Sequence, residues 1–150
     1  MIDATTFSEI EDRYTSGAYT KRPLTLVRGK GCHVWDDTGN EYLDLTSGQG
    51  VALLGHGHPT VAQAVAQQAS TLITAAEAFH NNRRAQLYVV LSQLFGDERR
   101  YFLSNSGAEA NEAALKVARL LTGRSGIVAA MRGFHGRTLG ALGATYNTDY

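Results

Sequence analysis

The segment YFLSNSGAEANEAALK, residues 101–116, constrains the fold of this chain more than any other. A short apolar run enters a Ser-Gly-Ala turn at residues 106–108, and a strongly helical segment follows it. The first turn of a helix has unpaired N–H groups and a partial positive charge, so a phosphate can bind there without any Lys or Arg. The segment therefore predicts a strand, a tight turn and a helix whose N-terminus is suited to an anion.

Two interpretations of this turn stay open at the level of the residues. Gly107 and Ala108 are small, so a phosphate could come close to the backbone. Ser106 and Glu109 have the spacing of a capping box, which many helices use merely to begin.

Composition excludes several classes of function. The 150 residues contain 14 Lys and Arg against 14 Asp and Glu, which argues against a nucleic-acid groove or an acidic membrane surface as partner. The single Cys32 cannot form an internal disulfide, which fits a reducing compartment. The acidic N-terminus is unlike a secretory signal, and the longest apolar runs are too short to span a bilayer. We expect a cytoplasmic protein that binds neither nucleic acid nor a membrane.

The first third of the chain predicts a helix followed by a small antiparallel meander. Residues 8–14 fit a short amphipathic helix, and close turns separate three short β-prone runs. The expected strands are residues 24–28, 32–35 and 41–45.

After residue 58 the pattern changes to helices alternating with strands. Pro59 suits the first position of a helix, and Gly96 suits the end of another. We expect a strand at residues 99–103, a helix at 108–121 and a strand at 127–131. This alternation is typical of a parallel sheet that is covered by helices.

Several short motifs do not support a function. Gly48-Gln49-Gly50 lacks the third glycine of a dinucleotide fingerprint, and no nucleophile elbow occurs. His56 and His58 have no Cys or carboxylate at ligand spacing, so we predict no metal site and a structural role for both histidines.

A second group of residues follows the expected strand at 127–131. Phe134 follows Gly133 and stands two residues before Gly136, so little crowds its ring and it could stack on a flat group. Arg137 offers a bidentate fork for a carboxylate or phosphate. In open α/β sheets, ligands bind at the carboxyl ends of strands. If the two strands are close in the sheet, both turns lie together and suit a phosphorylated aromatic cofactor. The residues alone do not name that cofactor.

Six blocks of the sequence, in this order, resemble the N-terminal part of class III aminotransferases. They are VRGKG at 27–31, VWDD at 34–37, GNEYLD at 39–44, GHGHP at 55–59, NSGAEANEAALK at 105–116 and GFHGRT at 133–138. The resemblance implies the fold of fold-type-I enzymes that use pyridoxal 5'-phosphate (PLP). It is strongest for the branch that contains acetylornithine aminotransferase and the enzymes acting on LysW-linked aminoadipate semialdehyde.

The resemblance assigns roles to four residues. Gly107 and Ala108 match the pair whose backbone N–H groups bind the PLP phosphate, although the family commonly has threonine where this chain has Ala108. Phe134 matches the aromatic residue that stacks on the cofactor ring. Arg137 matches the arginine that binds the substrate α-carboxylate in the acetylornithine branch. No residue of this chain matches a catalytic one.

The family's Schiff-base lysine and the aspartate that pairs with the pyridine nitrogen come past residue 150. We therefore expect a truncated chain: residues 1–57 contribute to the small domain, and 58–150 form the first part of the large PLP-binding α/β domain. The 150 residues alone are predicted to be inactive.

The resemblance also implies substrates and partners. For the parent enzyme it implies amino transfer between acetylornithine, or a carrier-linked lysine precursor, and 2-oxoglutarate, in arginine and lysine biosynthesis. It further implies a homodimer and, for the lysine branch, an amino-group carrier protein. Two alternatives stay open: an aminotransferase for ornithine, 4-aminobutyrate or another omega-amino acid, and a non-catalytic fragment.

Overall fold

The computed structural model describes residues 6–146 and divides into two compact units, residues 1–76 and 77–150. No helix within residues 6–146 is long and apolar enough to cross a bilayer.

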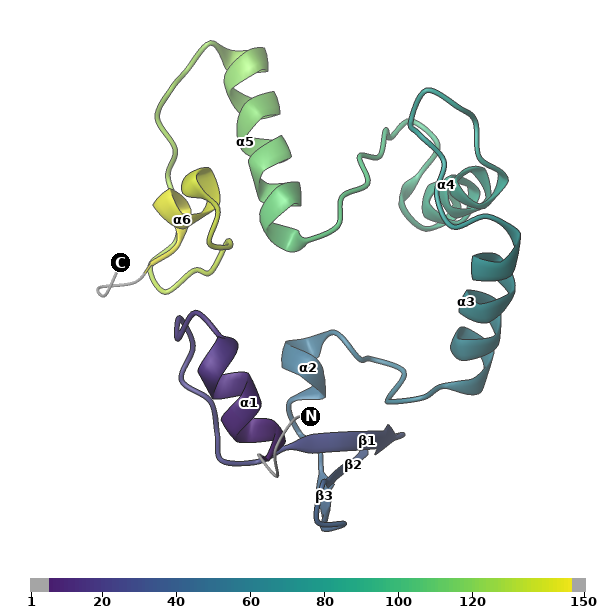
Figure 1. Ribbon diagram of the computed structural model, residues 1–150. Coiled ribbons are helices and arrows are strands. Elements are labelled where there is room, and N and C mark those ends of the chain that lie inside the picture. Colours follow the sequence, from purple (N-terminus) through teal and green to yellow (C-terminus); the bar gives the residue numbers. More distant parts are fainter. Residues whose placement is uncertain (1–5, 147–150) are drawn as a thin grey trace. The chain divides into compact units, whose positions relative to one another are not determined.

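The first unit contains a helix, a three-stranded meander, a short turn and a second long helix (Figure 1). Its elements are α1 Phe7–Tyr14, β1 Leu26–Lys30, β2 His33–Asp36, β3 Glu41–Leu43, α2 Ser47–Gly50 and α3 Pro59–Thr71. The helix expected at 8–14 and the helix start at Pro59 are thus confirmed, and the three expected strands are present with ends that differ by a few residues.

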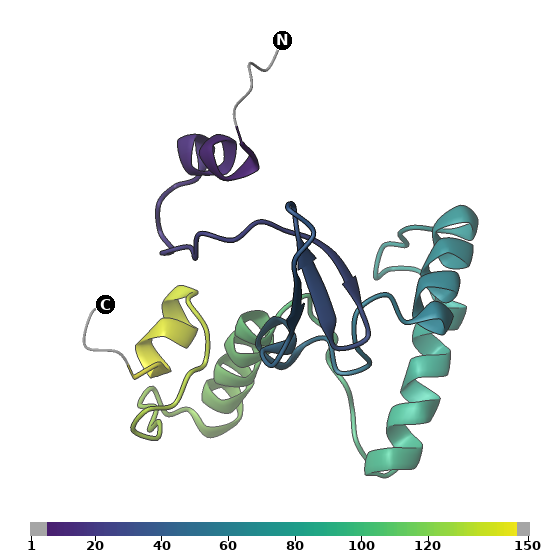
Figure 2. The ribbon, with the colours of Figure 1, turned by 90° about the horizontal axis from the view of Figure 1, so that it is seen from below.

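The meander is antiparallel throughout, with the order β1-β2-β3, and Figure 2 shows its strands in dark blue. Asp36 is buried at the turn between β2 and β3, and its carboxylate accepts bonds from Thr38, Asn40 and the Tyr42 hydroxyl. Burial raises the pKa of Asp36, but the hydrogen bonds from Asn40, Thr38 and Tyr42 outweigh it and hold that pKa well below its ordinary value. Asp36 therefore organises this turn as a carboxylate.

A second carboxylate ties the end of the meander to the Gly-His turn. Asp44 accepts the N–H groups of Thr46 and Ser47, and its Oδ2 lies 2.7 Å from Nε2 of His56. The contact with His56, followed by those with Thr46 and Ser47, lowers the pKa of Asp44. His56 also bridges to Gly31 through the backbone, so the structural role predicted for His56 has a physical basis.

The element α2 is a left-handed turn. Ser47, Gly48, Gln49 and Gly50 all have positive φ, which is costly for residues other than glycine. Gly48 and Gly50, which resemble part of a dinucleotide fingerprint, thus adopt the positive φ that this turn requires.

The second unit contains α4 Asn82–Phe95, α5 Gly107–Thr122 and α6 Leu139–Ala144. Helix α4 ends at Gly96 as expected, and α5 matches the helix expected at 108–121. Helix α6 lies beside α5 in both ribbon views, and no sequence pattern predicted it (Figures 1 and 2).

The two strands expected in this unit are not formed in this structure. Residues 99–103 and 127–131 belong to no strand, and Val128 is fully exposed. The reason is that a strand exists only when a neighbour supplies its hydrogen bonds, and strands of a parallel sheet are buried on both faces. Neither segment finds such a neighbour among the described residues.

Little apolar surface is buried in either unit. Among the described residues, the buried hydrophobic side chains are Val34 in the first unit and Ala141 in the second. Local hydrogen bonds and caps, rather than a shared core, fix the turns and helix starts of each unit.

Candidate functional site

The N-terminus of α5 presents backbone donors beside open space. Ser106 is the N-cap, and its Oγ accepts the N–H of Glu109 at 3.2 Å. Within residues 6–146, the N–H groups of Gly107 and Ala108 donate to no other group. A Cβ at position 107 would meet no atom within 4 Å, so the described residues do not crowd Gly107.

The second turn packs directly against this helix start through Gly136. Gly136 is buried and has a φ of +128°, a conformation that favours glycine. A Cβ at position 136 would lie 2.6 Å from the Cβ of Ala108, closer than two non-bonded carbon atoms approach. The absence of a side chain at Gly136 therefore lets the turn at 133–138 lie against the first turn of α5.

Polar side chains hold the same turn from two directions. Asn111 of α5 donates its Nδ2–H to the carbonyl oxygen of His135 at 2.6 Å. The hydroxyl of Thr145 accepts the N–H of His135 and lies 3.0 Å from the carbonyl oxygen of Gly136. The backbone on the N-terminal side of Arg137 is thereby fixed to α5 and to the end of α6.

Glu112 fixes the other side of the turn. Its Oε1 accepts the Thr138 hydroxyl at 2.6 Å, the N–H of Gly140 at 2.8 Å and the N–H of Ala141 at 3.2 Å. The bond from Thr138 first, then those from Ala141 and Gly140, lowers the pKa of Glu112. A carboxylate from α5 thus caps the start of α6.

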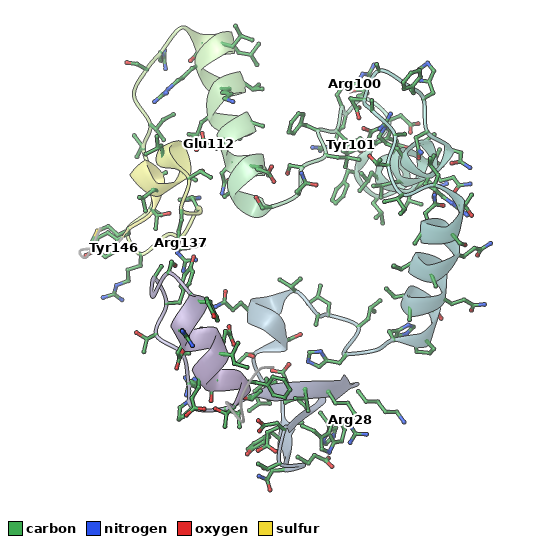
Figure 3. All side chains as sticks on the ribbon, in the orientation of Figure 1. Arg28, Arg100, Tyr101, Glu112, Arg137 and Tyr146 are labelled. Atoms are coloured by element: carbon green, nitrogen blue, oxygen red, sulfur yellow. The ribbon has the colours of Figure 1, made fainter. Side chains whose placement is uncertain are left out.

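Phe134 and Arg137 both project from this fixed turn. The Phe134 ring is exposed, and the guanidinium carbon of Arg137 lies 5.5 Å from the centre of that ring. Figure 3 shows Arg137 on the segment before α6, with Glu112 on α5 nearby in the chain's second unit. A ring and a cation are therefore held on one short turn.

The structure brings the four predicted site residues to two adjoining turns. The N–H groups of Gly107 and Ala108 donate to no other described group, and the Phe134 ring is exposed beside the Arg137 guanidinium. Whether they hold a phosphorylated aromatic group stays a prediction. The contact between Ala108 and Gly136 brings the two predicted turns together without any sheet between them.

A groove on α5 borders this site at Glu112. It has a volume of about 910 Å³ and runs along α5 and residues 102–105, but it is mainly apolar and includes none of the four predicted site residues. No group of His, Cys, Asp or Glu in the described part of the chain is arranged to hold a metal ion.

Sequence reasoning missed Asn111 and Glu112. Both lie in the segment that singled out α5, but a helix of Glu, Asn and Ala gives no sign of which polar side chain faces inward. The available signal was Thr138 followed by the small residues Gly140 and Ala141, a pattern that permits a helix start against another element.

Comparison with known proteins identifies the family. The family model for aminotransferase class III matches residues 14–150. The chain is 43% identical over 143 residues to an acetylornithine aminotransferase of Methanopyrus kandleri, covering 95% of this chain and 37% of that relative. It is 46% identical over 141 residues to a LysW-aminoadipate semialdehyde transaminase of Deinococcus radiodurans, covering 93% of this chain and 33% of that relative.

Solved structures agree on the fold. An ornithine aminotransferase of Toxoplasma gondii superposes with a TM-score of 0.88 at 32% identity, over 95% of this chain and 35% of that one. A taurine:2-oxoglutarate aminotransferase of Bifidobacterium kashiwanohense, solved with PLP and glutamate, gives a TM-score of 0.85 at 30% identity, over 93% of this chain and 32% of that one.

The chain belongs to the class III aminotransferase family, and the predicted fold class, that of the fold-type-I PLP enzymes, is confirmed. It spans about a third of the length of these relatives.

Proposed function

We propose that this chain is the N-terminal part of a PLP-dependent aminotransferase that moves an amino group between acetylornithine, or a carrier-linked lysine precursor, and 2-oxoglutarate. The observation that carries the proposal is the junction of Ala108 with Gly136, which joins an anion-binding helix start to a turn bearing a ring and an arginine. Similarity to relatives with acetylornithine and LysW-aminoadipate activities supports the choice of substrates.

In this proposal the N–H groups of Gly107 and Ala108 bind the cofactor phosphate. Ala108 keeps the backbone donor but lacks the hydroxyl of the threonine common in the family, so it contributes one contact fewer. Phe134 stacks on the cofactor ring and limits its tilt. When bound, PLP supplies an electron-accepting ring that stabilises negative charge on the carbon next to the amino group.

Arg137 binds the substrate α-carboxylate and orients the substrate relative to that ring. A guanidinium is always charged and matches the two oxygens of a carboxylate, which suits it to the α-carboxylate of the proposed substrate. None of the four residues transfers a proton or forms a covalent bond, and no residue of this chain matches the family's Schiff-base lysine. The chain of 150 residues alone is proposed to be inactive.

A second substrate class deserves a test, because the ornithine aminotransferase of Toxoplasma gondii has a high structural similarity. Aminotransferases for ornithine, 4-aminobutyrate or another omega-amino acid therefore form the alternative. A non-catalytic fragment is the alternative of another class. The homodimer, the carrier protein, the cytoplasmic location and the domain boundary at 57/58 stay predictions.

The proposal is tested by the Arg137→Ala variant of the full-length protein. We expect kcat/KM for acetylornithine to fall by about 100-fold or more, as for the loss of an ionic hydrogen-bonded pair. Turnover of 4-aminobutyrate, which has no α-carboxylate, should change much less. Arg124→Ala, an exposed arginine in the loop after α5, is the matched control. An equal loss with both substrates would contradict the role of Arg137.

The inactivity of residues 1–150 is tested separately. The purified chain is mixed with PLP, acetylornithine and 2-oxoglutarate, and glutamate is measured. We expect none above a protein-free blank, and sustained turnover would overturn the prediction.

A further inference from the structure

Glu112 reaches across to a segment that is remote in the sequence. Its Oε1 accepts hydrogen bonds from residues 26, 28 and 29 positions later in the chain. A Cβ at position 140 would lie 2.5 Å from Oε2 of Glu112, so a side chain there would displace this carboxylate. The packing at Gly140 and the three hydrogen bonds thus define one position for this carboxylate.

The capping arrangement of α6 is unusual in a way that involves Glu112. Thr138 is the N-cap of α6, yet its side chain does not accept an N–H of the first turn. A threonine in this position normally does so. Here the Thr138 hydroxyl donates to Glu112, and Glu112 accepts the N–H groups of Gly140 and Ala141 instead. The capping function has therefore moved from Thr138 to a side chain of α5.

This arrangement brackets Arg137. Two positions before it, Asn111 holds the carbonyl oxygen of His135, and one position after it, Glu112 holds the hydroxyl of Thr138. Both anchors come from adjacent residues of α5, which also begins with Gly107 and Ala108. Hydrogen bonds thus fix the backbone on both sides of Arg137 to the same helix that begins with the proposed phosphate donors.

We propose that Glu112 is a positioning residue for Arg137, and that it improves the binding of the substrate carboxylate by holding the Arg137 backbone rigid. The proposal rests on the function proposed above for Arg137. An arginine on a loose turn would lose conformational entropy each time it binds a carboxylate, and a turn fixed in advance avoids that loss. In this proposal Glu112 acts through the Arg137 backbone and not directly on cofactor or substrate.

The decisive experiment is a double-mutant cycle in the full-length enzyme. Glu112→Gln keeps the size of the side chain but replaces one carboxylate oxygen by an NH₂ group and removes the charge. We expect KM for acetylornithine to rise about 10-fold with kcat changed less than about twofold, as for the weakening of an ionic hydrogen-bond cluster. In the Arg137→Ala background the same substitution should have no further effect on KM.

A role confined to folding would give a different result. Glu112→Gln would then lower the amount of active enzyme or kcat equally in both backgrounds, and the cycle would be additive. That outcome, or an unchanged KM in the single variant, overturns the proposal. Glu98→Gln, a carboxylate in the loop after α4, is the control for loss of one negative charge.

A readout independent of activity separates this proposal from the proposed function. Amide hydrogen exchange at residues 133–141 of the cofactor-free enzyme should be at least about 10-fold faster in Glu112→Gln than in the wild type, because the turn opens locally more often. Unchanged exchange would contradict the claim that Glu112 holds this turn rigid. Faster exchange in an enzyme that has no activity on acetylornithine would support that claim while contradicting the proposed function.

Thr138→Val keeps the experiment interpretable if Glu112→Gln does not fold. This variant removes only the hydroxyl and leaves the bonds from Gly140 and Ala141 to Glu112. We expect the same direction of change in KM and in hydrogen exchange at a smaller amplitude, and no change in either would overturn the proposal.

Discussion

At the scale of single residues, Gly136 is the point at which the two turns of the site meet. Its φ of +128° and the 2.6 Å between its Cβ position and Ala108 both exclude a side chain. Gly136→Ala combines backbone strain with overpacking, so we expect a loss of roughly 2–5 kcal/mol in the free energy of unfolding of the full-length protein.

The matched control for this variant is Gly143→Ala. Gly143 lies in α6 with no atom within 4 Å of its Cβ position, and alanine is the better helix former. We expect this variant to be neutral or to gain up to about 1 kcal/mol. Urea denaturation measures both, and equal midpoints for Gly136→Ala and the wild type would contradict the junction as described.

The sequence contained part of this information. Local sequence patterns, a helix start and a glycine-rich turn, identify Gly107, Ala108, Phe134 and Arg137. No local pattern identifies Glu112, because its partners lie 26 to 29 residues away and only the folded backbone brings them together. A local pattern can mark a helix start such as Thr138, but it does not show which distant side chain bonds to it.

At the scale of elements, helices and the meander were predictable because local signals define them. Ser106 caps α5, Gly96 ends α4 and Pro59 begins α3, each at the position expected. Residues 99–103 and 127–131 differ, since a strand depends on its neighbours as well as on its own residues. Helix α6 escaped prediction because it is six residues long and its cap comes from another helix.

The meander makes a prediction about acid. Asp36 and Asp44 both have pKa values below the ordinary value of about 3.9, so each stabilises the folded state as a carboxylate. This contribution is complete above the unfolded-state pKa and is lost as the pH falls through the folded-state pKa. We expect the meander to lose stability progressively below about pH 4.

Trp35 on β2 is the single tryptophan of the sequence and reports on this change. Its fluorescence is followed during acid titration of the full-length protein, with Trp35→Phe to subtract other signals. Asp36→Asn should be less stable than the wild type at pH 7 and show a smaller dependence on acid. Identical acid profiles for both proteins would show that Asp36 does not stabilise the meander.

At the scale of the whole molecule, exposed apolar side chains outnumber buried ones in each unit. Leu53 and Ile73 in the first unit, and Leu120 and Val128 in the second, are each more than 80% exposed. A chain with so small a core lacks the hydrophobic burial that makes unfolding cooperative. The apolar groove along α5, and the segments 99–103 and 127–131 that pair with no strand, also leave apolar surface uncovered.

We therefore expect residues 1–150 on their own to unfold over a broad range of urea and to bind a hydrophobic dye such as ANS. Circular dichroism and dye fluorescence measure this. A steep, single transition that coincides in both signals would contradict the expectation.

The central claim is that the backbone N–H groups at the start of α5 bind the phosphate of PLP, and Gly107→Pro tests it most directly. Proline suits the first position of a helix, and the extended backbone of Ser106, with φ −150° and ψ 160°, suits the residue before proline. The variant thus removes one donor while the helix start is kept, and Gly107→Ala is the control that retains the donor.

The measurement is the dissociation constant of PLP, obtained by spectroscopic titration of the full-length apoenzyme. We predict a 10- to 100-fold weaker affinity for Gly107→Pro, corresponding to the loss of about 1.5–3 kcal/mol for a hydrogen bond to a charged group, and little change for Gly107→Ala. Equal affinity of Gly107→Pro and the wild type, with both proteins folded, would contradict the claim that this helix start holds the phosphate.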